Sequence, residues 1–301
     1  MSTYTILATA RSFAKANPLP LALLEEAGCK VIRPKDDEEL KKLLPEADGV
    51  VAGLEPYDAE TLKGCGKLKV ISRYGVGCDA IDLEAAREKG IKVAYTPGAN
   101  SDSVADLAVS LMLAAARHVP RMDAAIKKGG HERPLGVEMW RKTLGVIGAG
   151  RIGKGVMKRA SGFEMRLLCY DTFRDESAVS ALGGRYVDLD TLYAQSDFIT
   201  VHLPLTGETR GMIAEKEFKK MKKSAVIVNT ARGGIIDESA LCEALKSGAI
   251  FAAGLDVTVD EPPGGSPLCA LPNCILLPHA GAATVEAAHN MGMMAVENLL
   301  G

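Results

Sequence analysis

The sequence lacks the cysteine and histidine clusters that mark a zinc site or a disulfide framework. Its cysteines form no Cys-x-x-Cys pair, their number is odd, and they stand at positions 29, 65, 78, 169, 242, 269 and 274. We therefore expect no bound metal, and we expect reduced thiols that mostly fill the core of a cytoplasmic protein.

The chain also lacks an excess of charge and a long hydrophobic run. The formal net charge is −2 at pH 7, so nothing indicates a nucleic acid or an anionic membrane as a partner. The first residues, MSTYTILATA, show no basic stretch followed by a long apolar one, so we expect no secretory signal. The longest apolar helical run, near residues 107–116, is too short to span a bilayer.

Short apolar runs alternate with amphipathic runs along most of the chain. Because the chain has 301 residues, of which 47% are hydrophobic, it is long enough for two domains with ample cores. The alternation predicts an α/β fold with two doubly wound parallel sheets. The runs that we interpret as strands are 4–9, 30–33, 49–52, 70–73, 93–95, 142–147, 165–170, 198–202, 225–229, 252–256 and 274–277. The helical runs are 20–27, 37–44, 59–62, 83–89, 103–117, 122–128, 154–161, 215–220, 238–247 and 284–300.

A glycine-rich turn stands in the middle of the chain, after the strand run 142–147. Gly148, Gly150 and Gly153 have the Gly-x-Gly-x-x-Gly spacing of a dinucleotide-binding turn. The first glycine permits the tight turn, the second lets a pyrophosphate approach the backbone, and the third lets the next helix pack closely. Asp171 lies 171 − 150 = 21 residues after Gly150, where a ribose-binding acid belongs. The alternative is a glycine-rich turn without a ligand.

The position of this turn indicates a discontinuous domain organisation. A dinucleotide turn normally opens its own domain, yet here it follows about 98 residues with their own alternating pattern, which Pro97-Gly98 interrupts. We therefore predict a nucleotide-binding domain over 99–277. The flanking domain would comprise 1–98, with 278–301 returning to it because chain termini tend to lie close together.

Three polar residues follow strand-like runs at the predicted carboxyl edge, where ligands bind in open α/β sheets. Arg232 follows VIVNTA, Glu261 lies in VDEPP, and His279 follows ILLP. Arginine suits a carboxylate and polarises a carbonyl, histidine moves a proton near neutral pH, and a carboxylate beside an imidazole fixes its tautomer. Singly, each has a structural alternative: a surface ion pair, a packed histidine or a solvated turn. Together with the dinucleotide turn they indicate hydride transfer.

Seven segments carry a family resemblance over about residues 50–295. They are SRYGVGCDAID, NSDSVADLAVSLML, KTLGVIGAGRIG, DFITVHLPLT, VNTARGGIIDE, LDVTVDEPP and LLPHAGAAT. In this order they resemble the D-isomer-specific 2-hydroxyacid dehydrogenases, and within them the D-3-phosphoglycerate dehydrogenase group. The resemblance implies a Rossmann NAD-binding domain inserted in a discontinuous flavodoxin-like substrate domain, with the active site in the interdomain cleft. It also implies a homodimer built on the nucleotide domain.

The same resemblance implies roles for individual residues. Arg232 would bind substrate, Glu261 would be the partner of the histidine, and His279 would be the acid/base. The cofactor-binding residues would be Gly148, Gly150, Arg151, Ile152, Gly153, Asp171, His202, Pro204, Thr230 and Asp256. Arg151 and Ile152 would lie over the pyrophosphate, Asp171 on the adenosine ribose, Asp256 on the carboxamide and Thr230 in the nicotinamide pocket. His202 and Pro204 would flank the adenine side, although His202 fits plain packing equally well.

The substrate loop would comprise Arg73, Tyr74, Gly75, Val76 and Gly77, whose backbone N–H groups would bind the substrate carboxylate. Arg73 suits a phosphate-bearing tail, which makes 3-phosphoglycerate the first candidate substrate; the alternative is an ion pair with an acid such as Asp79. NAD is favoured over NADP because Asp171 would repel a 2′-phosphate, with Arg174 leaving some NADP use open.

Two other functions remain open. A glyoxylate/hydroxypyruvate reductase would use the same residues on a small 2-oxoacid. A dinucleotide-sensing protein that binds partner proteins, similar to the C-terminal-binding-protein corepressors, would use the scaffold without requiring turnover. Long phosphoglycerate dehydrogenases carry C-terminal regulatory domains, and the chain ends at Gly301, so we do not expect serine feedback of that kind.

Overall fold

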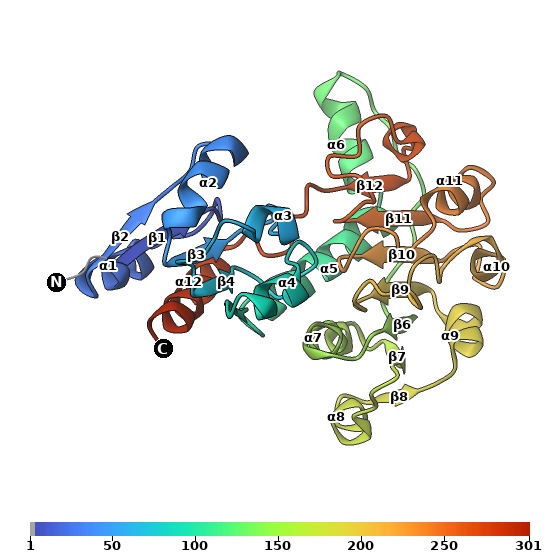
Figure 1. Cartoon of the computed structure of the whole chain (residues 1–301). Coiled ribbons are helices and arrows are strands. Elements are labelled where there is room, and N and C mark those ends of the chain that lie inside the picture. The colour runs from blue at the N-terminus through green and yellow to red at the C-terminus, as the bar shows by residue number, and fades with distance from the viewer. Residues whose placement is uncertain (1–3) are drawn as a thin grey trace. The chain divides into compact units, whose positions relative to one another are not determined.

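The computed structural model describes residues 4–301, and the chain divides into two compact units. One unit comprises Met1–Ser103 with Ala282–Gly301, and the other comprises Val104–Gly281. Each is built around its own all-parallel sheet with helices against both faces (Figure 1). The predicted α/β class with two parallel sheets is therefore confirmed. The predicted domain boundaries, 98/99 and 277/278, lie five and four residues before those of the units (103 − 98 = 5; 281 − 277 = 4).

The first unit has a five-stranded sheet in the order β2-β1-β3-β4-β5, which is a flavodoxin-like order. Its strands are β1 (Tyr4–Ala8), β2 (Cys29–Ile32), β3 (Gly49–Ala52), β4 (Val70–Arg73) and β5 (Lys92–Ala94). Its helices are α1 (Leu19–Glu26), α2 (Asp37–Leu43), α3 (Ala59–Leu62), α4 (Leu83–Glu88) and α12 (Val285–Leu300), with a 3-10 turn at Leu44–Glu46.

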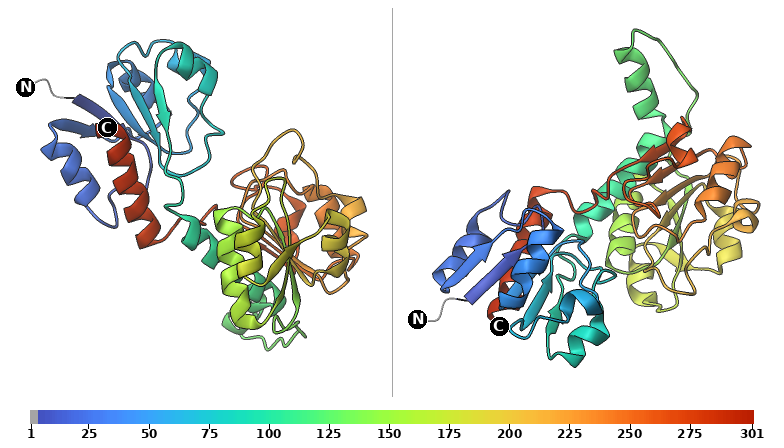
Figure 2. Two further views of the ribbon diagram at one scale, coloured as in Figure 1. Left: turned by 90° about the horizontal axis from the view of Figure 1, so that it is seen from below. Right: turned by 45° about the horizontal axis from the view of Figure 1, so that its top comes forward.

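The last helix belongs to the core of this first unit. Met291 and Ala295 of α12 are buried against Ile6 of β1 and Leu24 of α1, and both views of Figure 2 show α12 in red beside the blue elements. The opposite face of the sheet is covered by α2 and α3. A segment nearly 200 residues beyond β5 thus completes the sheet's hydrophobic cover, since a parallel sheet must bury both faces.

The second unit has a seven-stranded sheet in the order β12-β11-β10-β9-β6-β7-β8. The strands are β6 (Thr143–Ile147), β7 (Arg166–Tyr170), β8 (Gly184–Tyr186), β9 (Phe198–Val201), β10 (Val226–Asn229), β11 (Ala252–Leu255) and β12 (Cys274–Leu276). The order runs outward from β6 in both directions, so the strand order reverses between β6 and β9. This reversal is the point where α/β sheets bind nucleotides.

Helices cover both faces of the second sheet. The helices of this unit are α5 (Ser101–Ala116, in this unit from Val104), α6 (Val119–Lys127), α7 (Arg151–Ala160), α8 (Glu176–Ala181), α9 (Leu189–Gln195), α10 (Glu215–Phe218) and α11 (Glu238–Lys246), with 3-10 turns at Ser161–Phe163 and Pro267–Ala270. Val226 and Val228 of β10 pack on the α5 and α7 side, and Ile227 packs on the α9 and α11 side. This alternation along an apolar strand is expected when both faces are buried.

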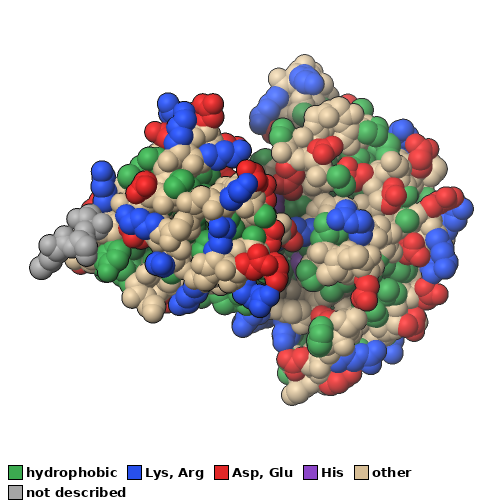
Figure 3. Space-filling view, viewed as in Figure 1, with side chains coloured by type: hydrophobic (Ala, Val, Ile, Leu, Met, Phe, Trp, Pro, Cys, Tyr) green, Lys and Arg blue, Asp and Glu red, His purple; other side chains and the backbone are tan. Residues whose placement is uncertain are grey.

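The sequence reasoning missed three elements, α8, β8 and α9, which lie between residues 176 and 195. β8 is a short edge strand without a buried residue, so it has no apolar run to signal it. Helices α8 and α9 are short, with six and seven residues, and each begins after a capping aspartate, Asp175 and Asp188. None of the helices within residues 4–301 is long and apolar enough to cross a membrane, and acidic and basic side chains are interspersed over the face shown in Figure 3.

Candidate active site

The glycine-rich turn joins β6 to α7 and is held by close backbone contacts. Gly148 has φ +97°, and a Cβ there would come within 2.8 Å of the backbone of His202. A Cβ on Gly153 would lie 2.1 Å from the carbonyl oxygen of Gly148. The N–H of Gly148 donates to the carbonyl of Tyr170 at the end of β7 (2.8 Å). Glycine at these two positions is therefore a steric requirement of the turn.

Gly150 differs from its two neighbours because a Cβ there would meet nothing within 4 Å. It is the N-cap of α7, and no side chain caps that end of the helix. The first N–H groups of α7, including those of Arg151 and Ile152, therefore receive no side-chain cap and lie at the positive end of the helix dipole. The residues present fit a pyrophosphate at this turn.

Asp171 follows β7 and lies against the same turn. Its Oδ2 accepts a hydrogen bond from the N–H of Ala149 (2.7 Å), and its Oδ1 accepts one from the N–H of Phe173 (2.9 Å). Ala149 lies between Gly148 and Gly150, so the carboxylate is fixed directly beside the proposed pyrophosphate position. Each carboxylate oxygen keeps a second lone pair for a ribose hydroxyl.

His202 comes directly after β9 and lies between two threonines. Its Nε2 is 2.9 Å from Oγ1 of Thr200, and its Nδ1 is 3.5 Å from Oγ1 of Thr230. Desolvation by burial lowers the pKa of His202 to about 3, so the ring is neutral at pH 7. These contacts are those expected if His202 serves packing and not adenine binding. Pro204, two residues later, is exposed.

The turn that carries Arg232 is organised by a residue that the sequence reasoning did not select. Asn229 ends β10; its Nδ2 donates to the carbonyl of Arg232 (2.8 Å) and its Oδ1 accepts from the N–H of Ala231 (2.9 Å). Arg232 itself is half-buried, and its Nη1 donates to the carbonyl of Ala231 (2.7 Å). The signal that could have found Asn229 is an amide side chain ending an otherwise apolar strand.

Glu261 and His279 form the pair that the sequence predicted. Oε2 of Glu261 lies 2.9 Å from Nδ1 of His279, and both side chains are about one-third exposed. In this contact Nδ1 carries a proton and donates it in a hydrogen bond to the carboxylate of Glu261. Nε2 is then the ring nitrogen left to exchange a proton with a substrate.

Asp256, at the end of β11, holds the loop that carries this histidine. Its side chain is 1% exposed, and its two oxygens accept hydrogen bonds from the N–H groups of Ala280 (2.7 Å) and Gly281 (2.8 Å). The N–H of His279 donates to the carbonyl of Asp256 (2.8 Å). His279 has φ +54°, a left-handed conformation that a non-glycine residue keeps only when its surroundings impose it. Asp256 therefore positions His279, a role that residue spacing alone does not reveal.

The predicted substrate loop follows β4 in the first unit, and most of its polar groups are engaged within that unit. The buried guanidinium of Arg73 donates from Nε to the carbonyl of Gly77 (2.7 Å) and from Nη1 to the carbonyl of Tyr74. The hydroxyl of Tyr74 donates to the carbonyl of Ala288 in α12 (2.7 Å). The N–H of Gly75, at φ +138°, donates to Oγ1 of Thr96 (3.0 Å).

These bonds leave only part of the predicted amide nest. The N–H of Gly75 is already used, whereas those of Val76 and Gly77 make no hydrogen bond within residues 4–301. Thr96, which the sequence reasoning did not select, also donates its hydroxyl to the carbonyl of Gly75 (3.1 Å). It is a polar residue directly after the strand run 93–95, which is the signal that could have identified it.

The predicted residues of the second unit gather at the carboxyl ends of its central strands. They follow four strands that are neighbours in the sheet. The turn at Gly148 follows β6, His202 follows β9, the turn with Asn229 and Thr230 lies at the end of β10, and the Asp256 loop follows β11. The N–H of Asp256 donates to the carbonyl of Asn229 (2.9 Å), linking the last two. Among the residues that the structure describes, no group of three His, Cys, Asp or Glu side chains could hold a metal ion.

Solved structures of known proteins share this arrangement of strands. Residues 109–281 match the family model of the D-isomer specific 2-hydroxyacid dehydrogenase NAD binding domain. The chain is 46% identical over 267 residues to D-3-phosphoglycerate dehydrogenase of Archaeoglobus fulgidus, covering 87% of this chain and 51% of that one. It is also 46% identical over 270 residues to hydroxypyruvate reductase of Thermotoga maritima, covering 88% and 87%. The structure of TT0316 protein from Thermus thermophilus superposes with a TM-score of 0.89 at 40% identity, covering 98% and 96%.

The reversed strand order and the uncapped α7 turn thus define a nucleotide-binding protein of the α/β class. The chain belongs to the D-isomer specific 2-hydroxyacid dehydrogenase family, whose members act on CH–OH groups, and NAD is the cofactor that its matched domain binds. The predicted family and cofactor are confirmed. The chain spans about half the length of the D-3-phosphoglycerate dehydrogenases that it matches.

Proposed function

We propose that this chain catalyses NAD-dependent hydride transfer at C2 of a small D-2-hydroxyacid or the corresponding 2-oxoacid. The observation that carries the proposal is the Glu261–His279 contact of 2.9 Å in the unit that also holds the uncapped α7 turn. An acid–base pair and a dinucleotide site are the two parts that carbonyl–alcohol interconversion requires.

The roles of the side chains follow from their bonds. The chemistry that bound NAD supplies is transfer of a hydride to or from C2 of the substrate. Nε2 of His279 takes the hydroxyl proton in oxidation and returns it in reduction, while Glu261 orients the ring and balances the imidazolium charge. Arg232 binds the substrate carboxylate and polarises the 2-oxygen. Of the residues proposed to bind the cofactor, Asp171 binds the adenosine ribose and Thr230 lies in the nicotinamide pocket. Asp256 holds the loop that carries His279.

The proposed substrate loop offers two N–H groups to the carboxylate, those of Val76 and Gly77. Arg73 fixes their position, because its guanidinium binds the carbonyls of Tyr74 and Gly77 at the two ends of the loop. These bonds support a small unphosphorylated acid, such as hydroxypyruvate or glyoxylate, over 3-phosphoglycerate, for which Arg73 would have to bind a phosphate. 3-Phosphoglycerate stays the second candidate because relatives that are 46% identical carry the name D-3-phosphoglycerate dehydrogenase.

The acid–base assignment predicts the effect of His279→Gln. Glutamine keeps a polar side chain but cannot exchange the proton, so we expect kcat to fall by about 10²–10⁴-fold. NADH affinity, measured by fluorescence titration, should stay within about twofold, because His279 is not among the residues proposed to bind the cofactor. A variant that keeps more than a tenth of the wild-type kcat would contradict the assignment.

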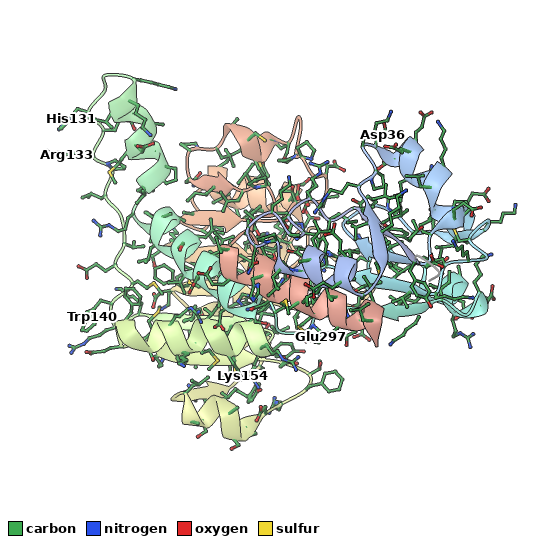
Figure 4. All side chains as sticks on the ribbon, turned by 90° about the vertical axis from the view of Figure 1, so that its left-hand side faces the viewer. Asp36, His131, Arg133, Trp140, Lys154 and Glu297 are labelled. Carbon is green, nitrogen blue, oxygen red and sulfur yellow. The ribbon has the colours of Figure 1, made fainter. Side chains whose placement is uncertain are left out.

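We also propose that two copies of the chain form a homodimer through the second unit, around α6 and the segment 128–140. Helix α6 has no buried residue, and in Figure 4 His131 and Arg133 lie on the segment that follows it. Exposed apolar side chains run along this region, with Ile126 58% and Leu135 91% exposed. A partner surface would remove this apolar area from water.

The cysteines support the proposal of a cytoplasmic location. All seven are free thiols, and four of them are buried. Burial raises the pKa values of Cys169 and Cys274 to about 12, which keeps both thiols protonated and unreactive at neutral pH.

A further inference from the structure

A carboxylate oxygen without a partner lies at the carboxyl edge of the first unit's sheet. Glu55 follows β3 by three residues, and its Oε2 is buried and has no hydrogen-bond partner within residues 4–301. Leaving a buried acceptor unsatisfied is costly, and more so when the group is charged. Each such group in a folded protein therefore calls for an explanation, and a ligand that donates a hydrogen bond is one.

The loop that carries Glu55 starts beside the proposed substrate loop. Strand β3 pairs in parallel with β4, with Ala52 opposite Arg73 (Figure 1). The N–H of Tyr74 donates to the carbonyl of Ala52 (2.9 Å). The loops that leave these two strands thus start side by side at the same edge of the sheet. Glu55 is in the first of these loops, and the N–H groups proposed to bind the substrate carboxylate are in the second.

The carboxylate is held over the backbone of Gly53. A Cβ on Gly53 would lie 2.7 Å from Oε1 and 2.8 Å from Oε2 of Glu55, so a larger residue there would displace the carboxylate. Gly53 is fixed in turn, because its N–H donates to Oγ1 of Thr9 (3.0 Å), which lies 3.1 Å from the hydroxyl of Tyr57. The Glu55 carboxylate therefore packs on a stretch of backbone that hydrogen bonds hold in place.

The Glu55 carboxylate and the Arg73 guanidinium both act on the buried hydroxyl of Tyr57. Burial raises the pKa of Tyr57, the Thr9 hydrogen bond lowers it, Glu55 raises it further and Arg73 lowers it. The hydroxyl of Tyr57 thus lies within the electrostatic reach of both Glu55 and Arg73. A further anion entering this cluster would meet the carboxylate as well as the guanidinium, whose bonds already go to loop carbonyls.

We propose that Glu55 is a specificity-determining residue, which selects a 2-hydroxyacid or 2-oxoacid with a short hydroxylated tail and disfavours a phosphorylated tail. This rests on the proposed function. A carboxylate oxygen only accepts hydrogen bonds, so a hydroxyl of the substrate satisfies Oε2. A phosphate group carries nearly two negative charges at pH 7 and offers acceptors, so it repels the same oxygen. A site built to bind a hydroxyl discriminates strongly against substrates that leave its polar groups unpaired.

The test compares Glu55→Gln with the wild-type chain on hydroxypyruvate and on its phosphorylated counterpart, 3-phosphohydroxypyruvate, using NADH. We expect the wild type to favour hydroxypyruvate at least tenfold in kcat/KM. Glutamine keeps the shape of the side chain, removes its charge and adds a hydrogen-bond donor for phosphate. The preference for hydroxypyruvate in kcat/KM should therefore fall by about tenfold, mainly through a lower KM for 3-phosphohydroxypyruvate. Glu60→Gln, which makes the same change on an exposed residue of α3, should leave the preference unchanged.

Two results would overturn the assignment while leaving the proposed function intact. One is a wild-type chain that favours 3-phosphohydroxypyruvate, and the other is a preference that Glu55→Gln leaves within twofold of wild type. Glu55→Ala serves as a second variant if the glutamine variant does not fold, with the thermal midpoint measured for each. A wild-type chain that binds NADH but turns over no 2-oxoacid would instead overturn the proposed function, and the assignment with it.

Discussion

Single side chains determine where the proposed acid–base group lies. Asp256 accepts hydrogen bonds from the two N–H groups that follow His279, and Glu261 fixes the ring through Nδ1. The residue types could be predicted from the sequence, since Arg, Glu and His follow three strand-like runs. The clamp by Asp256 could not, because it depends on two backbone N–H groups that only the folded loop brings within 2.8 Å of the carboxylate.

At the same scale, His202 predicts a pH dependence of stability. Burial lowers its pKa to about 3, whereas an unfolded histidine has a pKa of about 6.5. The unfolded chain therefore binds an extra proton between these values, and stability present above pH 6.5 is lost as the pH falls toward 3. Between pH 7 and pH 5 we expect the wild type to lose about 2 kcal/mol more free energy of unfolding than His202→Asn. Urea denaturation at pH 7, 6 and 5 measures this, and equal losses for both proteins would contradict it.

At the scale of elements, the β6–α7 turn assigns different tasks to its glycines. A Cβ fits at Gly150 without a contact but collides with the Gly148 carbonyl at Gly153. We therefore expect Gly150→Ala to keep the wild-type thermal midpoint within about 2 °C and to weaken NADH binding by about tenfold, because the added methyl group occupies the approach of the pyrophosphate. Gly153→Ala should lower the thermal midpoint by several degrees, since overpacking costs about 1–3 kcal/mol.

Thermal melts and NADH fluorescence titrations of both variants separate these effects. The reverse pattern, with a destabilised Gly150→Ala that binds NADH normally, would show that the turn is only structural. The different roles of Gly150 and Gly153, pyrophosphate approach and close helix packing, could be predicted from the Gly-x-Gly-x-x-Gly spacing. The elements between residues 176 and 195 were not, because short half-exposed segments such as β8 leave no apolar periodicity.

At the scale of the whole molecule, the alternation of apolar runs was enough to predict two parallel sheets. Strand order was not predictable from the runs alone, because it depends on which strands pair across long connections, such as β6 with β9. The return of α12 to the first unit could be expected from the tendency of termini to lie close together. The contacts of α12 with β1 and α1 could not be predicted from the sequence, because only the folded core brings these elements together.

The proposed homodimer is tested at this scale. We expect sedimentation equilibrium to give twice the chain mass of 31.8 kDa, and the double variant Ile126→Glu with Leu135→Glu to give one chain mass. The two introduced carboxylates would be buried in the dimer interface, and the free energy needed to bury these charges should prevent association. Leu19→Glu, at an exposed apolar position of the first unit, is the matched control and should remain dimeric. A wild-type monomer would overturn the proposal.

The proposed hydride transfer is tested most directly by the initial rate at 340 nm. The rate is measured with NAD and NADP on D-glycerate, D-lactate and 3-phosphoglycerate, and in reverse on hydroxypyruvate and glyoxylate. We expect turnover that depends on NAD, with hydroxypyruvate or glyoxylate preferred to the phosphorylated acids. NADH binding without turnover on any of these substrates would contradict it, and would favour a dinucleotide-sensing protein built on the same scaffold.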